Sequence, residues 1–160
     1  MSPFLPKLRM TLTVLLFAVT AQVSAQSAGK PVELVLNHRV DFQTENGIKS
    51  FCAHFADDLA SRQFGLMFQT DLPGQAGMLF DFQQSRTITM WMENTILSLD
   101  MIFITQDLKV LRIADHTTPY SREIISSQGN ARYVLEINAG RASQEGIDTG
   151  DLVSFTENGC

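Results

Sequence analysis

The sequence predicts a mainly β protein, a single compact domain of the sandwich or barrel kind with one short helix. About eight segments between residues 32 and 156 combine strand-forming residues with turn residues at their ends. Only one segment carries a helical signature, and strands and helices do not alternate, which argues against a doubly wound parallel sheet. We therefore expect one β-rich domain at 32–156, followed by a short tail at 157–160.

The first two predicted strands flank a turn. Residues 32–36, Val-Glu-Leu-Val-Leu, are rich in strand formers. The pair Asn46-Gly47 is a strong turn signal and precedes a second strand at 48–55. Alternation along this second strand places Phe, Ala and Phe on one face, as expected for a strand with one buried side.

The predicted helix follows, and strands dominate the rest of the chain. Asp57 is expected to cap a helix at 58–64, and Gly65 is expected to end it. Residues 139–146 form either one helical turn or a loop. Residues 101–104 are apolar at every position, as expected for a central strand. The remaining strands are expected at 78–82, 87–92, 101–105, 109–114, 133–138 and 152–156.

The first 25 residues have the pattern of a secretory signal peptide. Two basic residues precede an apolar run at 10–19, and Val23-Ser-Ala25 offers small residues before a predicted cleavage after Ala25. The apolar run is shorter than the roughly 20 residues that a membrane-spanning helix needs. We therefore expect an exported protein, periplasmic or secreted, with a flexible lead-in at 26–31 and no stable membrane insertion after cleavage.

Charge narrows the choice of partners. Cleavage would remove two of the 12 basic residues and leave 10 against 17 acidic residues, a net charge of −7. An acidic surface disfavours nucleic acid, whose phosphates attract Lys and Arg, and it disfavours an anionic membrane surface. The expected partner is a small molecule or an envelope protein.

The two cysteines, Cys52 and Cys160, leave two possibilities open. In an oxidising compartment they could form one disulfide. Such a bridge would close a loop of about 110 residues, worth on the order of 4–5 kcal/mol in the loop-entropy account. Alternatively, Cys52 is a small buried apolar residue and Cys160 is a free terminal thiol.

Five sequence blocks occur in order over about residues 50–156: Phe64-Gly-Leu-Met-Phe68, Gly77-Met-Leu-Phe80, Trp91-Met-Glu-Asn-Thr95, Leu99-Asp-Met-Ile-Phe103 and Val134-Leu-Glu-Ile-Asn-Ala-Gly140. Together they resemble the Domain of Unknown Function 192 family. The resemblance implies a β-rich, sandwich-like fold with a short helix in a small, often exported bacterial or archaeal protein. It implies no activity.

Two positions depart from that family's usual pattern. Glu93 stands where the family usually has Lys, and Ser98 stands where it usually has Pro. If the family site binds an anion through that Lys, Glu93 argues against such binding in this chain.

Polar residues interrupt these otherwise apolar blocks. A buried polar group is costly unless it is hydrogen-bonded, so each needs a structural or a functional reason. We expect these residues to converge on one rim and to line a small polar cleft that binds a small molecule. In the alternative, Asp100 and Glu136 accept hydrogen bonds from buried backbone N–H groups and Trp91 belongs to the core. The candidates are Trp91, Asn94, Thr95, Asp100, Glu136 and Asn138.

Two other chemistries have weaker support. Asp100 and Glu136 could act as the acid/base pair of a hydrolase if they lie about 5–9 Å apart. Thioether sulfur suits Cu(I), although methionine also fills β cores; the crowded methionines are Met67, Met78, Met90, Met92 and Met101.

Other metal and catalytic motifs have little support. Cys52 and His54 share a strand face and form a weak metal pair. Motifs for a zinc site, a phosphate loop or a catalytic triad do not occur. We therefore expect no metal or cofactor, and a non-enzymatic binding or accessory module is the leading interpretation.

Overall fold

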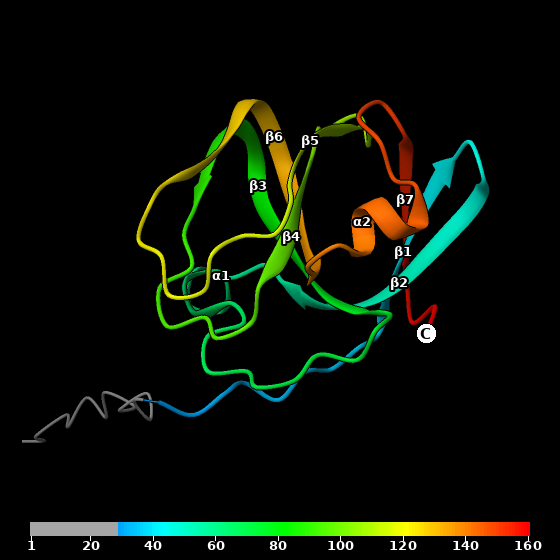
Figure 1. Ribbon diagram of the computed structural model, residues 1–160. Coiled ribbons are helices and arrows are strands. Elements are labelled where there is room, and N and C mark those ends of the chain that lie inside the picture. The colour runs from blue at the N-terminus through cyan, green and yellow to red at the C-terminus, as the bar shows by residue number, and fades with distance from the viewer. Residues whose placement is uncertain (1–28) are drawn as a thin grey trace, which may run out of the picture.

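Seven strands and two short helices make up residues 29–160, the part of the chain that the computed structural model describes (Figure 1). The predicted signal peptide at 1–25 and the first residues of the lead-in lie outside this range. The helices are α1 (Leu59–Phe64) and α2 (Arg141–Glu145). The strands are β1 (His38–Thr44), β2 (Gly47–Ala56), β3 (Ala76–Met90), β4 (Leu99–Ile104), β5 (Val110–Ala114), β6 (Ile125–Asn138) and β7 (Leu152–Glu157).

One curled sheet contains all of these strands in the order β5-β4-β6-β3-β2-β1-β7. Neighbouring strands are antiparallel except β2 and β3, which run parallel because α1 and a loop connect them. The two edges of the sheet meet briefly, where the Val110 N–H donates to the Asp151 carbonyl (3.0 Å) and the Val153 N–H donates to the Leu108 carbonyl (2.9 Å). The fold is a half-barrel, so the predicted mainly β class is confirmed, with α2 as a second short helix.

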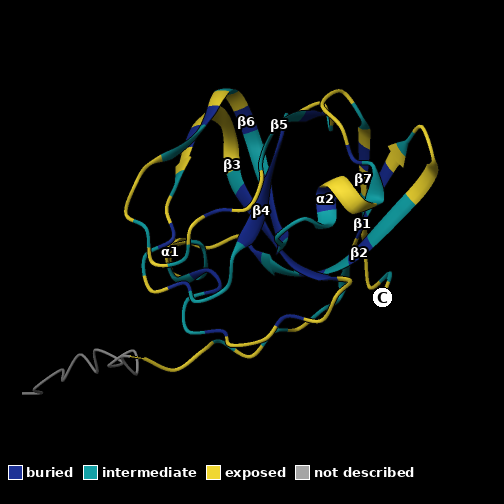
Figure 2. Ribbon diagram, in the orientation of Figure 1, coloured by how far each residue is buried: buried dark blue, intermediate teal, exposed yellow. Residues whose placement is uncertain are grey.

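Two apolar clusters lie on opposite faces of the sheet. The inner core takes side chains from all seven strands and from around α2: Val40, Phe42, Phe51, Ala53, Leu79, Ile102, Ile104, Val110, Leu135, Ile137, Val153, Ala142 and Ile147. The outer core packs on the other face of β3, β4 and β6; its large members are Leu66, Met78, Phe80, Ile88, Met92, Leu99, Met101 and Phe103. Figure 2 shows the central strands buried and the hairpin tips exposed.

Strand β4 lies between the two cores, and all six of its residues are buried. The prediction of a central strand at 101–104 is therefore confirmed. The predicted strands at 78–82 and 87–92 belong to one longer strand, β3, because register irregularities after Asp81 bend the pairing with β6 without ending it.

The predicted strand at 32–36 is wrong. This segment runs outside the sheet, and Leu34 and Leu36 pack against the outer core. The Val35 N–H donates to His54 Nδ1 (3.0 Å) instead of to a neighbouring strand. Strand β1, which pairs with both β2 and β7, has no counterpart among the strands predicted from the sequence.

Helix α1 begins one residue later than predicted. The carboxylate of Asp58, not of Asp57, accepts hydrogen bonds from the N–H groups of Ala60 (2.8 Å) and Ser61 (3.0 Å). Gly65 ends the helix as predicted, and its φ of +53° is a conformation that favours glycine.

A disulfide joins Cys52 in β2 to the terminal Cys160, with 5.9 Å between the two Cα atoms. The first of the two possibilities for the cysteines is therefore the one that the structure contains. The bridge attaches the tail after β7 to the middle of the sheet.

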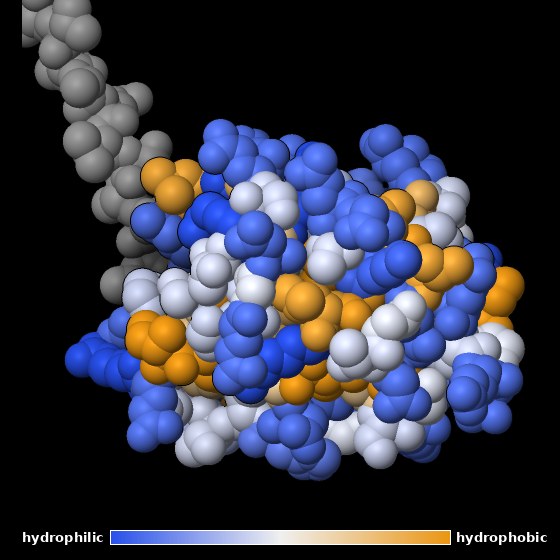
Figure 3. Space-filling view, turned by 90° about the horizontal axis from the view of Figure 1, so that it is seen from above, coloured by the Kyte–Doolittle hydropathy of each residue, from blue (hydrophilic) through white to orange (hydrophobic). Residues whose placement is uncertain are grey.

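The surface mixes polar and apolar groups. Seen from above, apolar side chains show through gaps among hydrophilic ones (Figure 3). Within residues 29–160, no helix has both the length and the apolar character that crossing a membrane requires.

Candidate functional site

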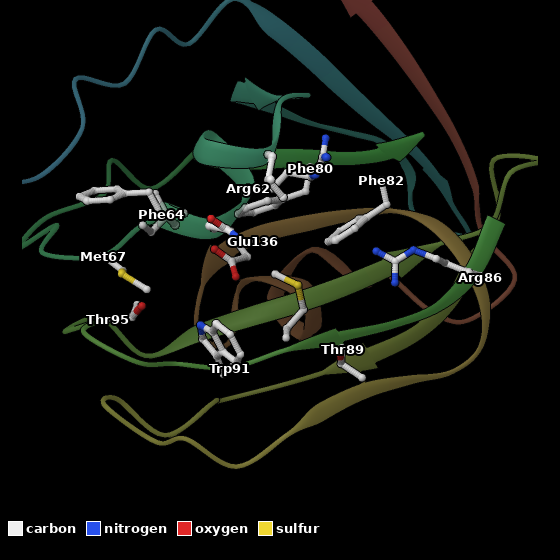
Figure 4. Close-up of a pocket in the computed structure, with 15 residues that line it drawn as sticks. Arg62, Phe64, Met67, Phe80, Phe82, Arg86, Thr89, Trp91, Thr95 and Glu136 are labelled. Atoms are coloured by element: carbon white, nitrogen blue, oxygen red, sulfur yellow. The ribbon is translucent and has the colours of Figure 1, made fainter. Parts of the chain in front are cut away.

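A cleft of about 190 Å³ lies between α1, the end of β3 and the face of β6 that carries the outer core (Figure 4). Its walls are mainly aromatic and thioether side chains, from Phe64, Phe80, Phe82, Trp91, Met67 and Met90. Its polar groups are few, and the most important are Arg62, Arg86, Thr89, Thr95 and Glu136. Apolar walls with a few polar groups are typical of small-molecule sites, although this cleft is smaller than most.

Glu136 provides an unusual buried carboxyl group in this cleft. It lies on β6 between Met78 of β3 and Met101 of β4, neither of which can donate a hydrogen bond. The residue is 4% exposed, and its side chain has no hydrogen-bond partner in residues 29–160. Burial raises the pKa of Glu136 to about 8, so the carboxyl group stays largely protonated at neutral pH.

Trp91 stands at the rim. It follows directly after β3 and is 49% exposed, and the neighbouring rim residue Leu59 of α1 is also exposed. Trp91 is the single tryptophan of the chain, so its fluorescence would report on this cleft alone. The alternative that Trp91 belongs to the core is therefore wrong.

The backbone around the rim is strained. Phe68, Asn94 and Tyr120 all have positive φ values, of 63°, 56° and 59°. Hydrogen bonds connect these segments, from the Phe68 N–H to the Asn94 carbonyl (2.9 Å) and from the Tyr120 N–H to the Thr95 carbonyl (3.0 Å). A positive φ is uncommon for bulky residues such as Phe68 and Tyr120 and is tolerated by Asn94, and five other non-glycine residues of the described chain share it.

Two arginines flank Phe82 at the other end of the cleft. Their guanidinium carbons lie 5.8 Å (Arg62) and 5.2 Å (Arg86) from the centre of the Phe82 ring. Arg62 donates from Nη1 to the carbonyls of Asp57 and Asp81. In the described part of the chain, neither guanidinium lies within 4.0 Å of a carboxylate.

The structure separates the two carboxylates that were expected to converge. Asp100 is paired with Ile137 across β4 and β6, whereas Glu136 is paired with Met101, so the two side chains point to opposite faces of the sheet. The expectation that Asp100 lines the same cleft as Trp91 and Glu136 was wrong.

Asp100 has a structural role instead. Its carboxylate accepts hydrogen bonds from the backbone N–H groups of His116 (2.9 Å), Gly140 (3.0 Å) and Ala142 (3.0 Å). These bonds fix the start of α2 and the loop after β5. The structural alternative therefore holds for Asp100 but not for Glu136, which accepts no such bonds in residues 29–160.

The other candidates divide in the same way. Thr95 lines the cleft with Trp91 and Glu136. Asn94 does not line the cleft, but its Nδ2 atom lies 3.8 Å from the sulfur of Met67, which does. Asn138 donates from Nδ2 to the Leu72 carbonyl (2.7 Å) and so fixes the loop after α1 instead of lining the cleft.

Glu93, the residue at the family's usual Lys position, is partly exposed and forms an ion pair with Arg122. It is not among the residues that line the cleft. Glu93 therefore takes no part in the walls of this site.

The remaining chemistries fit the structure less well. Asp100 and Glu136 cannot act as one acid/base pair from opposite faces of a sheet. Met78, Met92 and Met101 fill the outer core, which leaves Met67 and Met90 on the cleft. Residues 29–160 contain no group of three His, Cys, Asp or Glu residues placed to hold a metal ion, and the disulfide removes Cys52 from any pair with His54.

Sequence reasoning missed the aromatic walls and both arginines. Phe64 and Phe80 were within the family-like blocks, and the alternation of β3 places Phe80 and Phe82 on one face. No sequence signal joins Arg62 on α1 to Arg86 on β3, because only the packing of α1 against β3 brings them to one ring.

The fold and site define a small β half-barrel domain with a ligand-sized aromatic cleft. This chain belongs to the DUF192 family, whose model, described as an uncharacterized ACR family, matches residues 39–155. The expected family membership is thereby confirmed. No curated protein is detectably similar to the chain.

Two solved structures share the fold. A Sinorhizobium meliloti protein, described as a proposed transcription regulator, is 36% identical with a TM-score of 0.74, and the match covers 78% of this chain and 97% of that protein. A Novosphingobium aromaticivorans protein of unknown function is also 36% identical with a TM-score of 0.71, and the match covers 72% of this chain and 83% of that protein.

Proposed function

We propose that the protein is an exported small-molecule binding module whose ligand occupies the cleft beside α1. The observation that carries this proposal is the carboxyl group of Glu136: the residue is only 4% exposed, its carboxyl oxygens open onto the cleft, and the described residues give it no hydrogen bond. A buried polar group left unpaired costs free energy. A ligand that donates to Glu136 would remove that cost, and Trp91 at the rim would cover it.

Two features support export. The first 25 residues have the composition of a cleavable signal peptide. The Cys52–Cys160 disulfide suits an oxidising compartment, because cytosolic thiols are generally kept reduced. N-terminal sequencing of the protein from a periplasmic or secreted fraction should begin at Gln26, and an uncleaved cytosolic protein would contradict the proposal.

Regulation of transcription, the role in the description of the Sinorhizobium meliloti protein, has little support in this chain. Acidic residues outnumber basic ones by 17 to 12, whereas DNA binding requires basic side chains against phosphates. The opposed orientations of Asp100 and Glu136 give the carboxylate-pair hydrolase no support either.

A cleft-filling variant tests the binding function. Met90 lines the cleft and shares a face of β3 with Arg86 and the core residue Ile88, so Met90→Trp should fill the cleft. Thr87→Trp is the matched control, because Thr87 is exposed on the same strand and does not line the cleft. We expect some compounds of a metabolite collection to raise the melting temperature of the wild type and of Thr87→Trp, but not of Met90→Trp.

The size of the expected effect follows from linkage. A ligand at 100 times its Kd adds about 2.7 kcal/mol of stability, which raises the melting temperature of a domain of this size by several degrees. If no compound stabilises the wild type, or if Met90→Trp responds equally, then the cleft is not a binding site.

A further inference from the structure

We infer that the cleft binds a small zwitterion, with an ammonium group on Glu136 and a carboxylate at the Arg86 end, separated by an apolar chain. This inference rests on the proposed binding function and names the class of ligand. Three observations support it, one for each part of the ligand.

Glu136 is the group that would bind the ammonium end of the ligand. The carboxyl group receives no hydrogen bond from residues 29–160, and its neighbours across the sheet are Met78 and Met101. In Figure 4 it lies between Phe80 on one side and Trp91 on the other. A protonated carboxyl group can exchange hydrogen bonds with a neutral ligand, whereas an ammonium group displaces the proton and forms a stronger charge-assisted pair with the carboxylate. Aromatic faces add a favourable interaction with a cation.

The arginines beside Phe82 are the groups that would bind the carboxylate end of the ligand. Arg86 is exposed, and its one side-chain hydrogen bond within residues 29–160 is a long contact from Nη1 to the Thr87 carbonyl (3.5 Å). With Arg62 it places two positive charges around one aromatic ring, and neither has an anionic partner within 4.0 Å in the described chain. A guanidinium group binds a carboxylate through two parallel hydrogen bonds, which makes a ligand carboxylate the complementary group.

The apolar wall between these two ends indicates an apolar chain in the middle of the ligand. Figure 4 shows Phe82 between Arg86 and Glu136, so the opposite charges of the site are separated by an apolar surface. The volume of about 190 Å³ is only slightly larger than a cavity of about 150 Å³ that holds benzene. A short hydrocarbon chain with a charge at each end fits this arrangement.

Three matched probes test the assignment on the disulfide-bonded mature protein: 6-aminohexanoate, hexylamine and hexanoate. The first carries both charges, and each of the others lacks one of them. We expect 6-aminohexanoate to change the fluorescence of Trp91 in a saturable manner. Hexylamine and hexanoate should bind at least about tenfold more weakly than 6-aminohexanoate. Loss of one interaction of about 1.4 kcal/mol gives this factor.

Variants assign each charge to its residue. Glu136→Gln should weaken binding of 6-aminohexanoate and of hexylamine by at least about tenfold. Arg86→Gln should weaken the binding of 6-aminohexanoate but leave the binding of hexylamine unchanged. A general loss of structure would weaken the binding of both compounds. Glu123→Gln, a change at an exposed surface carboxylate, is the control and should alter neither.

Calorimetry adds a readout that is independent of fluorescence. Of the residues that line the cleft, Glu136 is the only one with a carboxyl group, and none is a histidine. Binding of the ammonium group near pH 7 should therefore release up to one proton from Glu136. The release is measured from the binding heats in buffers of different ionisation enthalpy, and it should vanish in Glu136→Gln.

The inference is overturned if 6-aminohexanoate does not bind, if hexanoate binds equally well, or if Glu136→Gln leaves the affinity unchanged. The proposed function can survive that result. If a neutral or purely anionic compound stabilises the wild type but not Met90→Trp, the cleft is still a binding site, and the zwitterion is excluded as its ligand.

Discussion

The buried carboxyl group of Glu136 should make the protein less stable as the pH rises. The pKa of this group is about 8 in the fold against an ordinary value of 4.5, because burial disfavours the ionised form. The folded chain therefore holds this proton more tightly than the unfolded chain does. Between pH 4.5 and 8 the unfolded chain releases the proton first, so the free energy of unfolding falls with pH through this window.

The size of the effect follows from the same two pKa values. Each pH unit between them is worth about 1.36 kcal/mol, which gives an upper value of about 5 kcal/mol between pH 4.5 and 8. Above pH 8 both states are ionised and the loss stops. Water that enters the cleft would reduce the cost of ionising Glu136, so we expect the free energy of unfolding to fall by about 2–5 kcal/mol over this pH range.

Glu136→Gln isolates this contribution, because glutamine keeps the shape of the side chain and cannot ionise. Urea unfolding at pH values from 5 to 9, without reductant and followed by circular dichroism, gives the free energy of unfolding of each protein. The advantage of the variant over the wild type should grow between pH 5 and 8 and then stay constant. Glu123→Gln should follow the wild type throughout. Parallel curves for wild type and Glu136→Gln would refute the burial argument.

Three further predictions concern stability. Asp100→Asn should cost about 3 kcal/mol in urea unfolding, because three backbone N–H groups lose a charged acceptor; an unchanged midpoint would contradict this role. Reduction of the Cys52–Cys160 disulfide, which spans 108 residues, should cost on the order of 4–5 kcal/mol, and reductant should not affect a variant with both cysteines replaced by alanine. Burial lowers the pKa of His54, so the folded state favours the neutral ring, and the stability that this gives above pH 6.5 should be lost as the pH falls. Melting temperatures measured at pH 5.5 and 7.5 should show this loss in the wild type but not in His54→Gln.

Local sequence was sufficient for the elements whose signals are local. The apolar run at 101–104 predicted a strand with both faces covered, and β4 is buried at every position. Gly65 marked the end of α1 because a positive φ there favours glycine. The segment at 32–36 shows the limit of this reasoning. Strand-forming residues also fit an extended segment that packs on a core without pairing, as Leu34 and Leu36 do.

The sequence by itself determined the mainly β class, the family and the suspicion that Asp100 and Glu136 needed a special reason to be buried. Only the tertiary structure decided why each of these two carboxylates is buried. Pairing of β4 with β6 turns the two carboxylates to opposite faces, so Asp100 meets backbone donors and Glu136 meets methionines and an aromatic cleft. Because side chains alternate along a strand, a shift of one residue in that register would exchange these environments, and register depends on contacts between segments far apart in the chain.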